Sequence, residues 1–288
     1  MTSPLPDLPP ISHLSPSIIR ILADNPSKFT LQGTNTYLVG TGAQRILIDT
    51  GEGKPAWAER LQQVLESEHA RVGTVLLTHW HHDHVGGVEQ VRALQPGVEV
   101  RKFVSPSGKG EASWRGIEDG EVVECEGARL RAVYSPGHTD DHVGFVLEDG
   151  GGALFAGDNV LGHGTAVFED LAVYMASLER MAGVVEGRLY PAHGDWVEDG
   201  RGKVREYIVH RRQREGEALE VLGREREDGE RGWGSMEMVK VIYAKYPESL
   251  HVPAEGSLRH VLKKLQGEGK VKEERGRWSL LGKEEGRL

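Results

Sequence analysis

The chain has 288 residues, a formal net charge of −9 and 38% apolar residues, enough to bury the core of one large domain or of one large and one small domain. It contains no apolar run long enough to cross a membrane, and its first residues lack the basic start and apolar stretch of a secretory signal. The single cysteine, Cys125, excludes an internal disulfide and fits a reducing compartment, so we predict a cytoplasmic protein.

The N-terminal part of the chain is predicted to contain strands, turns and two helices. Residues 1–16 are rich in proline and serine and are predicted to be irregular. Residues 18–49 have the pattern of strands and turns, and residues 56–66 have the apolar spacing of a helix. The short apolar run 74–77 is typical of a buried strand and ends directly before a cluster of histidines, after which a helix is predicted over 85–94.

The middle of the chain alternates between strand and helix patterns. Strands are predicted at 98–103, 121–124, 129–134, 143–147 and 153–156. Helices are predicted at 171–181 and 202–221. Because strands alternate with helices and several strands form hairpin-like pairs, the sequence predicts an α/β layered fold.

The C-terminal part has a different pattern. The charged, glycine-rich segment 224–234 is predicted to be a linker. Helices are predicted at 235–246 and 254–265 and a hairpin at 270–280, an order that resembles a small winged-helix module. The predicted organisation is a large domain over 1–223, the linker over 224–234 and a winged-helix-like domain over 235–288.

The most informative motif directly follows the predicted strand 74–77. The segment THWHHDHVGG supplies four side chains that can bind a metal, namely His79, His81, Asp83 and His84. Imidazole and carboxylate groups are the ligands that zinc prefers. Because side chains alternate along an extended segment, His79 and His81 lie on the same side and suit one metal ion. Asp83 and His84 lie where the loop turns into the next helix, so they can face a second metal.

Three later motifs, each after a predicted strand, offer further ligands. SPGHTDDH contains His138, FAGD contains Asp158 and YPAHG contains His193. Each motif alone is a weak signal, but their order after successive strands favours one shared site over a chance cluster on a solvated loop. Trp80 and His82 alternate with the ligands of the first motif and are predicted to point away from the metals.

With these seven positions filled, the sequence resembles the metallo-β-lactamase superfamily, whose H-x-H-x-D-H signature it matches without a departure. The resemblance implies an αββα sandwich with the site at one edge. It implies His79, His81 and His138 on one metal, Asp83, His84 and His193 on the other, and Asp158 between the two. It also implies two zinc ions, although manganese and iron accept the same ligands.

The motifs GTNTYLVGTG, ILIDTGEG and GDNVLGHGTAVFEDL resemble the branch of β-lactamase-like endoribonucleases, related to glyoxalase II, that carries a C-terminal winged helix. Within that branch, GDNVLGHGTAVFEDLAVYMASLERM and ESLHVPA look closest to fungal thioesterases that release polyketides, of the atrochrysone carboxyl acyl-carrier type. This resemblance implies hydrolysis of a polyketide thioester on an acyl carrier protein domain of a polyketide synthase. The attacking hydroxide would bridge the two metals, and Asp83 would orient it as the catalytic residue.

Two other functions remain open from the sequence. Endoribonuclease activity on single-stranded RNA needs a basic track toward the metals. Residues 235–288 carry 11 Lys and Arg against 8 Asp and Glu, which leaves −12 on the rest of the chain and argues against such a track. Duplex DNA binding by the winged helix would use a recognition face, for which the candidates are Arg259, His260, Lys263 and Lys264. The alternative, which we favour, is a helix face that packs on the catalytic domain and covers its cleft.

A few other residues have two interpretations each. His163 is a candidate to hydrogen-bond a metal ligand or to hold its own loop. Asn35 is a candidate to line the cleft or to form a turn. Tyr174 and Met175 are predicted to lie in a helix core, and His210 is predicted to be structural. The run Arg211, Arg212 and Arg214 is predicted to be a solvated face, with anion binding as the alternative.

Overall fold

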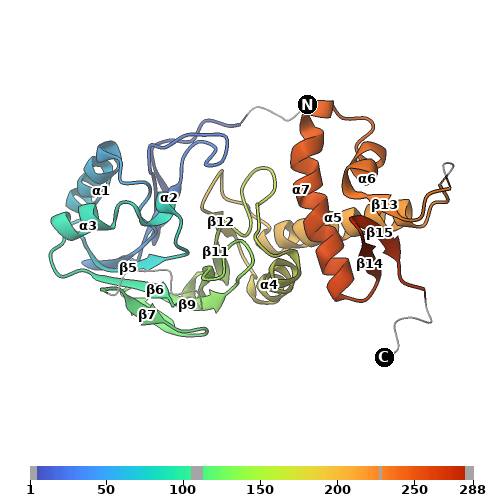
Figure 1. Cartoon of the computed structure of the whole chain (residues 1–288). Helices are drawn as coiled ribbons and strands as arrows, with labels where there is room; N and C mark the ends of the chain where they lie inside the picture. Colours follow the sequence, from blue (N-terminus) through green and yellow to red (C-terminus); the bar gives the residue numbers. More distant parts are fainter. Residues whose placement is uncertain (1–4, 105–112, 227–228, 283–288) are drawn as a thin grey trace. The chain divides into compact units, whose positions relative to one another are not determined.

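The computed structural model describes residues 5–104, 113–226 and 229–282, and the chain divides into two compact units (Figure 1). Unit 1 comprises Met1–Glu169 and Ala176–Tyr207, and unit 2 comprises Asp170–Met175 and Ile208–Leu288. The domain boundaries that the sequence suggests, at 223 and 234, stay a prediction. Within the described residues, no helix is both long enough and apolar enough to cross a bilayer.

Unit 1 contains a seven-stranded sheet whose spatial order follows the chain. Its strands are β1 (Ile11–Ser15), β2 (Ile18–Leu22), β3 (Asn35–Val39), β4 (Gln44–Ile48), β5 (Arg71–Leu77), β6 (Glu99–Phe103) and β7 (Arg115–Ile117). Strands β1 to β4 pair antiparallel, and β4 to β7 pair parallel. The carboxyl ends of the parallel strands therefore meet at one edge of the sheet.

A five-stranded sheet of unit 1 packs against the first. Its strands are β8 (Val122–Cys125), β9 (Ala128–Tyr134), β10 (Val143–Leu147), β11 (Ala153–Gly157) and β12 (Leu189–Pro191). Their order is β12-β11-β10-β9-β8, and only the β11–β12 pair is parallel. The 3-10 helix η1 (Glu148–Gly150) follows β10.

Side-chain alternation along the strands builds two cores on either side of the first sheet. Tyr37 and Val39 of β3 face the second sheet and pack with Phe145, whereas Leu38 faces the other way. On that outer side Leu38 packs with Trp57 of helix α1 (Pro55–Ser67). Both cores are made mainly of buried apolar side chains, so burial of this surface is the main force that holds the layers together.

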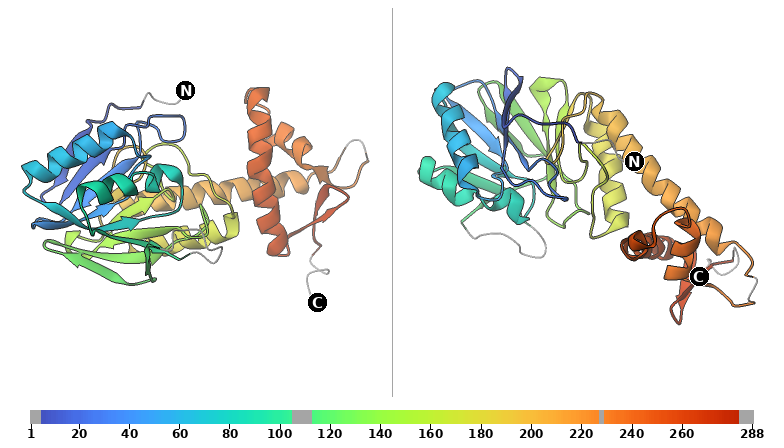
Figure 2. Two further views of the ribbon diagram at one scale, coloured as in Figure 1. Left: turned by 60° about the vertical axis from the view of Figure 1, so that its left-hand side comes forward. Right: turned by 90° about the horizontal axis from the view of Figure 1, so that it is seen from above.

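Helices cover the outer face of each sheet (Figure 2). Helices α1 and α3 (Val88–Leu94) lie on the seven-stranded sheet. The unit 1 parts of α4 (Leu171–Val184) and α5 (Gly200–Leu222) lie on the five-stranded sheet, where Met181 approaches Gly144 of β10. The order helix, sheet, sheet, helix is the αββα sandwich that the sequence predicts, so the expected fold class is confirmed.

Unit 2 contains the winged-helix domain that the sequence predicts. Its elements are α6 (Ser235–Ile242), the 3-10 helix η2 (Glu248–Leu250), α7 (His251–Gly267) and a sheet of β13 (Trp233–Gly234), β14 (Val271–Glu274) and β15 (Arg277–Leu280). The sheet order is β13-β15-β14, with β14 and β15 forming the predicted hairpin. Met238, Leu262 and Trp278 are buried in its core.

The structure corrects several predicted elements. Residues 11–15 form edge strand β1 because they pair with β2, although residues 1–4 lie outside the described part. The helix predicted at 85–94 is two helices, α2 (His82–Val85) and α3, interrupted by Gly86–Gly87. Part of the predicted linker, Trp233–Gly234, is strand β13, and residues 227–228 of that linker lie outside the described part. No residue range was predicted for the short strands β7 and β12, although the YPAHG motif was expected to follow a strand.

Candidate metal centre

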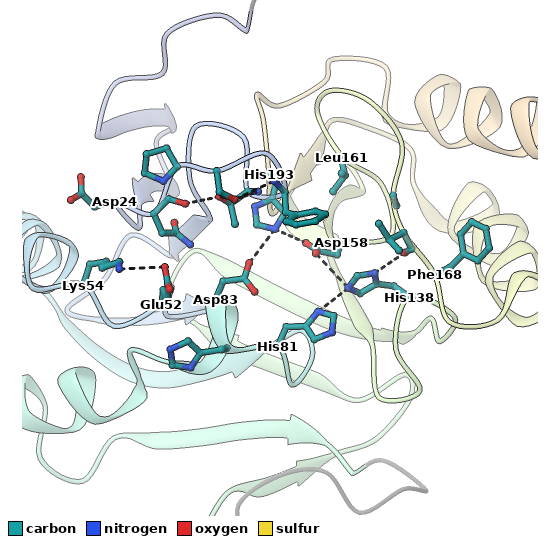
Figure 3. Close-up of a pocket in the computed structure, with 18 of the residues that line it drawn as sticks. Asp24, Glu52, Lys54, His81, Asp83, His138, Asp158, Leu161, Phe168 and His193 are labelled. Carbon is teal, nitrogen blue, oxygen red and sulfur yellow. Dashed lines mark hydrogen bonds and ion pairs between the residues drawn. The ribbon is translucent and has the colours of Figure 1, made fainter. Parts of the chain in front are cut away.

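The seven predicted ligands converge at one edge of the sandwich because each follows a strand end. His79, His81, Asp83 and His84 follow β5 of the seven-stranded sheet, on the loop into α2 and on α2 itself. The other three follow strands of the five-stranded sheet: His138 comes after β9, Asp158 after β11 and His193 after β12. Figure 3 shows five of the seven gathered at the base of a cavity.

The first cluster consists of His79, His81, His138 and Asp158. His79 Nε2 lies 2.9 Å from His81 Nδ1, and His138 Nε2 lies 3.3 Å from His79 Nε2 and 3.1 Å from His81 Nδ1. His138 Nε2 is also 3.4 Å from Asp158 Oδ2. Three imidazole nitrogens and one carboxylate oxygen therefore converge on one point, a donor set that suits a tetrahedral zinc ion.

The second cluster consists of Asp83, His84 and His193. Asp83 Oδ2 lies 3.3 Å from His84 Nε2 and 3.4 Å from His193 Nε2. The other carboxylate oxygen of Asp158, Oδ1, lies 3.1 Å from His193 Nε2 and 3.5 Å from His84 Nε2. Asp158 thus directs one oxygen to each cluster.

Two buried atoms of the site test whether a metal fits. Among the described residues, the buried atoms His84 Nε2 and Asp158 Oδ1 have no hydrogen bond of acceptable geometry, and the polar atoms nearest to them belong to other predicted ligands. Leaving such groups unsatisfied costs about 1–3 kcal/mol each, and coordination of a cation would satisfy both. The residues present therefore fit two metal ions, and imidazole and carboxylate ligands suit zinc, manganese or iron.

The surroundings lower the pKa of some histidines of the site and raise the pKa of another. Burial, together with the neighbouring histidines, lowers the pKa of His79 below its usual range and lowers the pKa of His81 to about 4. Burial also opposes protonation of His193, but Asp158 and Asp83 raise its pKa to about 9. The histidines beside Asp158 and Asp83 in turn outweigh the effect of burial and hold the pKa of both carboxyls below the usual range, so both stay ionised.

A shell of hydrogen bonds that the sequence patterns did not reveal fixes the ligands. Asp49 Oδ2 lies 2.8 Å from His84 Nδ1 and accepts a 2.9 Å hydrogen bond from Thr78 Oγ1. His142 Nε2 accepts a hydrogen bond from the backbone N–H of Asp158 at 3.2 Å. Such partners orient metal ligands and raise their basicity. Their signal in the sequence is only that Asp49 and His142 lie at strand ends, like the ligands.

The structure places the two residues that were predicted to lie around the ligands, Asn35 and His163, differently from each other. The Asn35 side chain does not line the cavity but donates to the carbonyl oxygens of Pro191 and Gly194, at 2.8 and 2.7 Å, and so holds the loop that carries His193. Within the described residues, His163 neither lines the cavity nor has a hydrogen bond to a ligand. Trp80 and His82 lie outside both clusters, although His82 lines the cavity.

The predicted arginine run is only partly a solvated face. Arg211 is buried and lies 5.8 Å from the ring centre of Tyr174, which is itself completely buried. Met175 is also buried, as predicted for a helix core. Arg214 pairs with Glu217 at 2.7 Å, so charges in this run already have partners within unit 2. His210 and Arg212 also form interactions of their own.

The proposed recognition face on α7 is likewise engaged by acidic side chains. Arg259 pairs with Glu255 at 2.9 Å, and Lys264 pairs with Glu215 at 2.9 Å. Lys263 is exposed, and His260 is half-buried. Two of the four predicted cations are therefore neutralised by neighbours within unit 2, which disfavours DNA binding through this helix.

A cavity of about 730 Å³ opens above the two clusters. Its floor includes His81, Asp83, His138, Asp158 and His193. Its apolar lining includes Phe29, Leu161, Ala166, Val167 and Phe168. Acidic residues Asp24, Glu52 and Glu169 also line it, and the one lysine among the lining residues, Lys54, lies 3.7 Å from Glu52. The volume is within the range of pockets that bind small molecules.

Comparison with known proteins gives two family matches. Residues 29–193 match the family described as metallo-beta-lactamase superfamily, and residues 234–278 match the beta-lactamase associated winged helix domain. A Drosophila melanogaster protein named beta-lactamase-like protein 2 homolog is 43% identical over 276 residues, covering 92% of this chain and 93% of that protein.

Fungal proteins and solved structures are also similar. The lactamase-like protein nscB of Arthroderma gypseum is 45% identical, covering 93% of this chain and 87% of that protein. The crystal structure of a beta-lactamase domain protein from Burkholderia ambifaria has a TM-score of 0.75 at 18% identity, covering 94% of this chain and 93% of that one. The last likeness shows the fold alone.

Proposed function

The chain belongs to the metallo-beta-lactamase superfamily of hydrolases, and from that premise we propose that it is a two-zinc thioesterase. The substrate we propose is an acyl thioester, specifically a polyketide carried by the acyl carrier protein domain of a polyketide synthase. The similarity to fungal lactamase-like proteins supports this choice within the superfamily. The proposed compartment is the cytoplasm, where the free thiol of Cys125 would stay reduced.

The observation that carries the proposal is the character of the cavity lining. An apolar side, with Leu161, Val167 and Phe168, faces a floor of metal-binding groups, whereas the charged residues of the lining are mainly acidic. An uncharged, apolar acyl chain can bury its surface there. An RNA strand would instead bring phosphates close to Asp24, Glu52 and Glu169, with Lys54 as the one lysine or arginine in the lining. The cavity therefore favours the thioester over RNA.

The chemistry of the leaving group agrees with the residues present. A thiol has a pKa of about 8.5, so a thiolate can leave without a proton donor. The leaving group of a phosphodiester or an amide is poorer and needs protonation or stabilisation by a metal. Bound zinc ions would supply a nucleophilic water at neutral pH and would stabilise charge on the carbonyl oxygen. No lining residue has to act as a general acid in this scheme.

We propose separate roles for two carboxylates of this chain, Asp158 and Asp83. Asp158 holds the two clusters at a fixed separation, since each of its oxygens faces one cluster. Asp83 lines the cavity and stays ionised, so it can accept a hydrogen bond from the attacking water and orient it. Thr34 Oγ1 donates to Asp83 Oδ2 at 3.3 Å and fixes the orientation of that carboxylate.

The proposal is tested with purified, metal-loaded protein and two substrates, an aromatic acyl thioester of N-acetylcysteamine and a single-stranded RNA. We expect release of free thiol and no RNA cleavage. Asp83→Ala should abolish thiol release, whereas Asp149→Ala, which removes an exposed carboxylate outside the cavity, should not. RNA cleavage with intact thioester would overturn the proposal in favour of an endoribonuclease. Metal analysis of the same sample would identify the ion.

A further inference from the structure

The cavity has one apolar wall, residues 161–169, which joins the two halves of the candidate metal centre. Leu161, Ala166, Val167, Phe168 and Glu169 of this wall line the cavity. Figure 3 labels Leu161 and Phe168 among them. Val167 is 66% exposed, although its carbonyl oxygen lies 2.7 Å from Nδ1 of His138 in the first cluster. An exposed valine at this position leaves apolar surface that a bound ligand could cover.

The wall is attached to metal-binding residues at both ends. Near its start, the Gly162 N–H donates to the carbonyl oxygen of His193 at 2.8 Å. Near its end, His138 Nδ1 donates to the carbonyl oxygen of Val167 at 2.7 Å, and the Glu169 N–H donates to the carbonyl oxygen of Gly137 at 2.7 Å. These bonds use backbone atoms of the wall, so they leave the exposed side chain of Val167 available to a ligand.

A tyrosine outside the cavity holds the turn of this wall. The hydroxyl of Tyr207 on α5 accepts a hydrogen bond from the Leu161 N–H at 3.1 Å and donates to the Gly164 carbonyl oxygen at 2.8 Å. Tyr207 is almost completely buried and does not line the cavity. Its ring is therefore a fixed support, and its hydroxyl bridges the two sides of the turn.

The approach of the neighbouring loop prevents the wall from shifting. A Cβ atom at Gly162 would lie 2.1 Å from the carbonyl oxygen of Asp195, so only glycine allows the two backbones to come this close. With one end against the His193 loop and the other on His138, the wall is formed before any ligand enters. A preformed surface binds without the entropic cost of ordering a loop.

We propose that this wall selects the acyl group, and this inference rests on the thioesterase function proposed above. Val167, together with the small part of Phe168 that is exposed, contacts the apolar part of an aromatic or similarly bulky acyl chain while the thioester carbonyl lies over the metal-binding groups. Tyr207 is a positioning residue that keeps the wall at the correct distance from His138. A short acyl group has little apolar surface to bury against the wall and therefore gains little from it.

The test uses Val167→Asn, with Val209→Asn as the matched control. Val209 is 64% exposed, nearly the same as Val167, but lies on α5 outside the cavity. The first measurement is the binding of 2-naphthoate and of acetate to metal-loaded protein by calorimetry, which requires no turnover. We expect Val167→Asn to weaken naphthoate binding roughly tenfold, acetate binding to stay the same, and Val209→Asn to behave as the wild type.

The second measurement is the hydrolysis of naphthoyl and acetyl thioesters. Tyr207→Phe should raise KM for the naphthoyl thioester while kcat/KM for the acetyl thioester stays the same, a split that general loss of structure would not give. Tyr243→Phe, in unit 2, is its control. Equal naphthoate affinity of Val167→Asn and wild type would overturn the role of the wall. If naphthoate binding depends on the wall but no thioester is hydrolysed, the proposed thioesterase function is wrong and the role of the wall in binding stands.

Discussion

The Nδ1 atom of His84 lies 2.8 Å from Oδ2 of Asp49, and both side chains are almost completely buried. The same carboxylate accepts hydrogen bonds from the backbone N–H and the hydroxyl of Thr78, at 2.8 and 2.9 Å. Asp49 therefore fixes which His84 nitrogen carries the proton and leaves Nε2 directed at the second cluster.

Replacement of Asp49 should weaken metal binding without removing a ligand. Asp49→Asn keeps the size of the side chain but loses the negative charge beside His84, and such changes typically cost 10–100-fold in metal affinity. Competition with a zinc chelator measures the affinity, and Asp149→Asn on η1 serves as the control. An Asp49→Asn protein that competes as well as the wild type would contradict this interpretation.

Asp158 lies between the two clusters, so its replacement should lower the metal content of both, whereas replacement of another ligand should affect mainly one. Asp158→Ala should lower the occupancy of both clusters, because each loses one oxygen. His193→Ala should empty mainly the second cluster and leave about one metal ion per chain. Metal analysis after dialysis distinguishes the two variants. Equal metal content in both would show that Asp158 serves one cluster only.

The ion pair between Lys102 of β6 and Asp141 should matter for stability, since both side chains are buried. Thr139 Oγ1 also donates to Asp141 Oδ1 at 2.6 Å. Lys102→Met leaves a buried carboxylate without its cation and should cost about 3–5 kcal/mol of unfolding free energy. The double variant Lys102→Met/Asp141→Leu should recover most of that loss. Urea unfolding of the three proteins tests this, and a double variant as unstable as the single one would refute it.

Gly87, between α2 and α3, lies so close to neighbouring residues that a larger residue there should lower the stability of the fold. An added Cβ would lie 2.1 Å from the carbonyl oxygen of Thr50 and 2.6 Å from Trp57, so Gly87→Ala should destabilise the protein by about 1–3 kcal/mol. At Gly183, inside α4, an added Cβ would have no described atom within 4 Å apart from its chain neighbours and the backbone of its own helix, so Gly183→Ala should be stabilising by about 0.5–1 kcal/mol. Thermal unfolding shows whether the two substitutions shift the midpoint in opposite directions.

The sequence patterns predicted the layers of the fold because apolar periodicity reports burial directly. The strands 74–77 and 143–147 and the hairpin at 270–280 were found this way, and the structure contains each of them. Short elements without periodicity were missed. β12 has three residues and forms because it pairs with β11 from another part of the chain, which no local pattern reports.

In the candidate site, too, local patterns were predictable from the sequence, whereas contacts between distant residues were not. The His79–His84 motif was visible because its ligand types crowd together within a few residues. The partners that orient the ligands were not visible, because Asp49 and His84 are separated by 35 positions and meet only in the folded chain. Asn35 was assigned to the cleft or a turn, but its amide binds carbonyl groups more than 150 positions away. Such contacts follow from tertiary structure alone.

The side chains of the two clusters follow strands of both sheets: four lie on α2 and the loop between β5 and α2, and three follow strands of the five-stranded sheet. Ions held there would act as cross-links between layers that are otherwise joined mainly by apolar packing. A cross-link that must break before the layers separate slows unfolding more than it speeds folding. Metal occupancy would then set the lifetime of the folded protein, and the chelated protein would be the more readily degraded form.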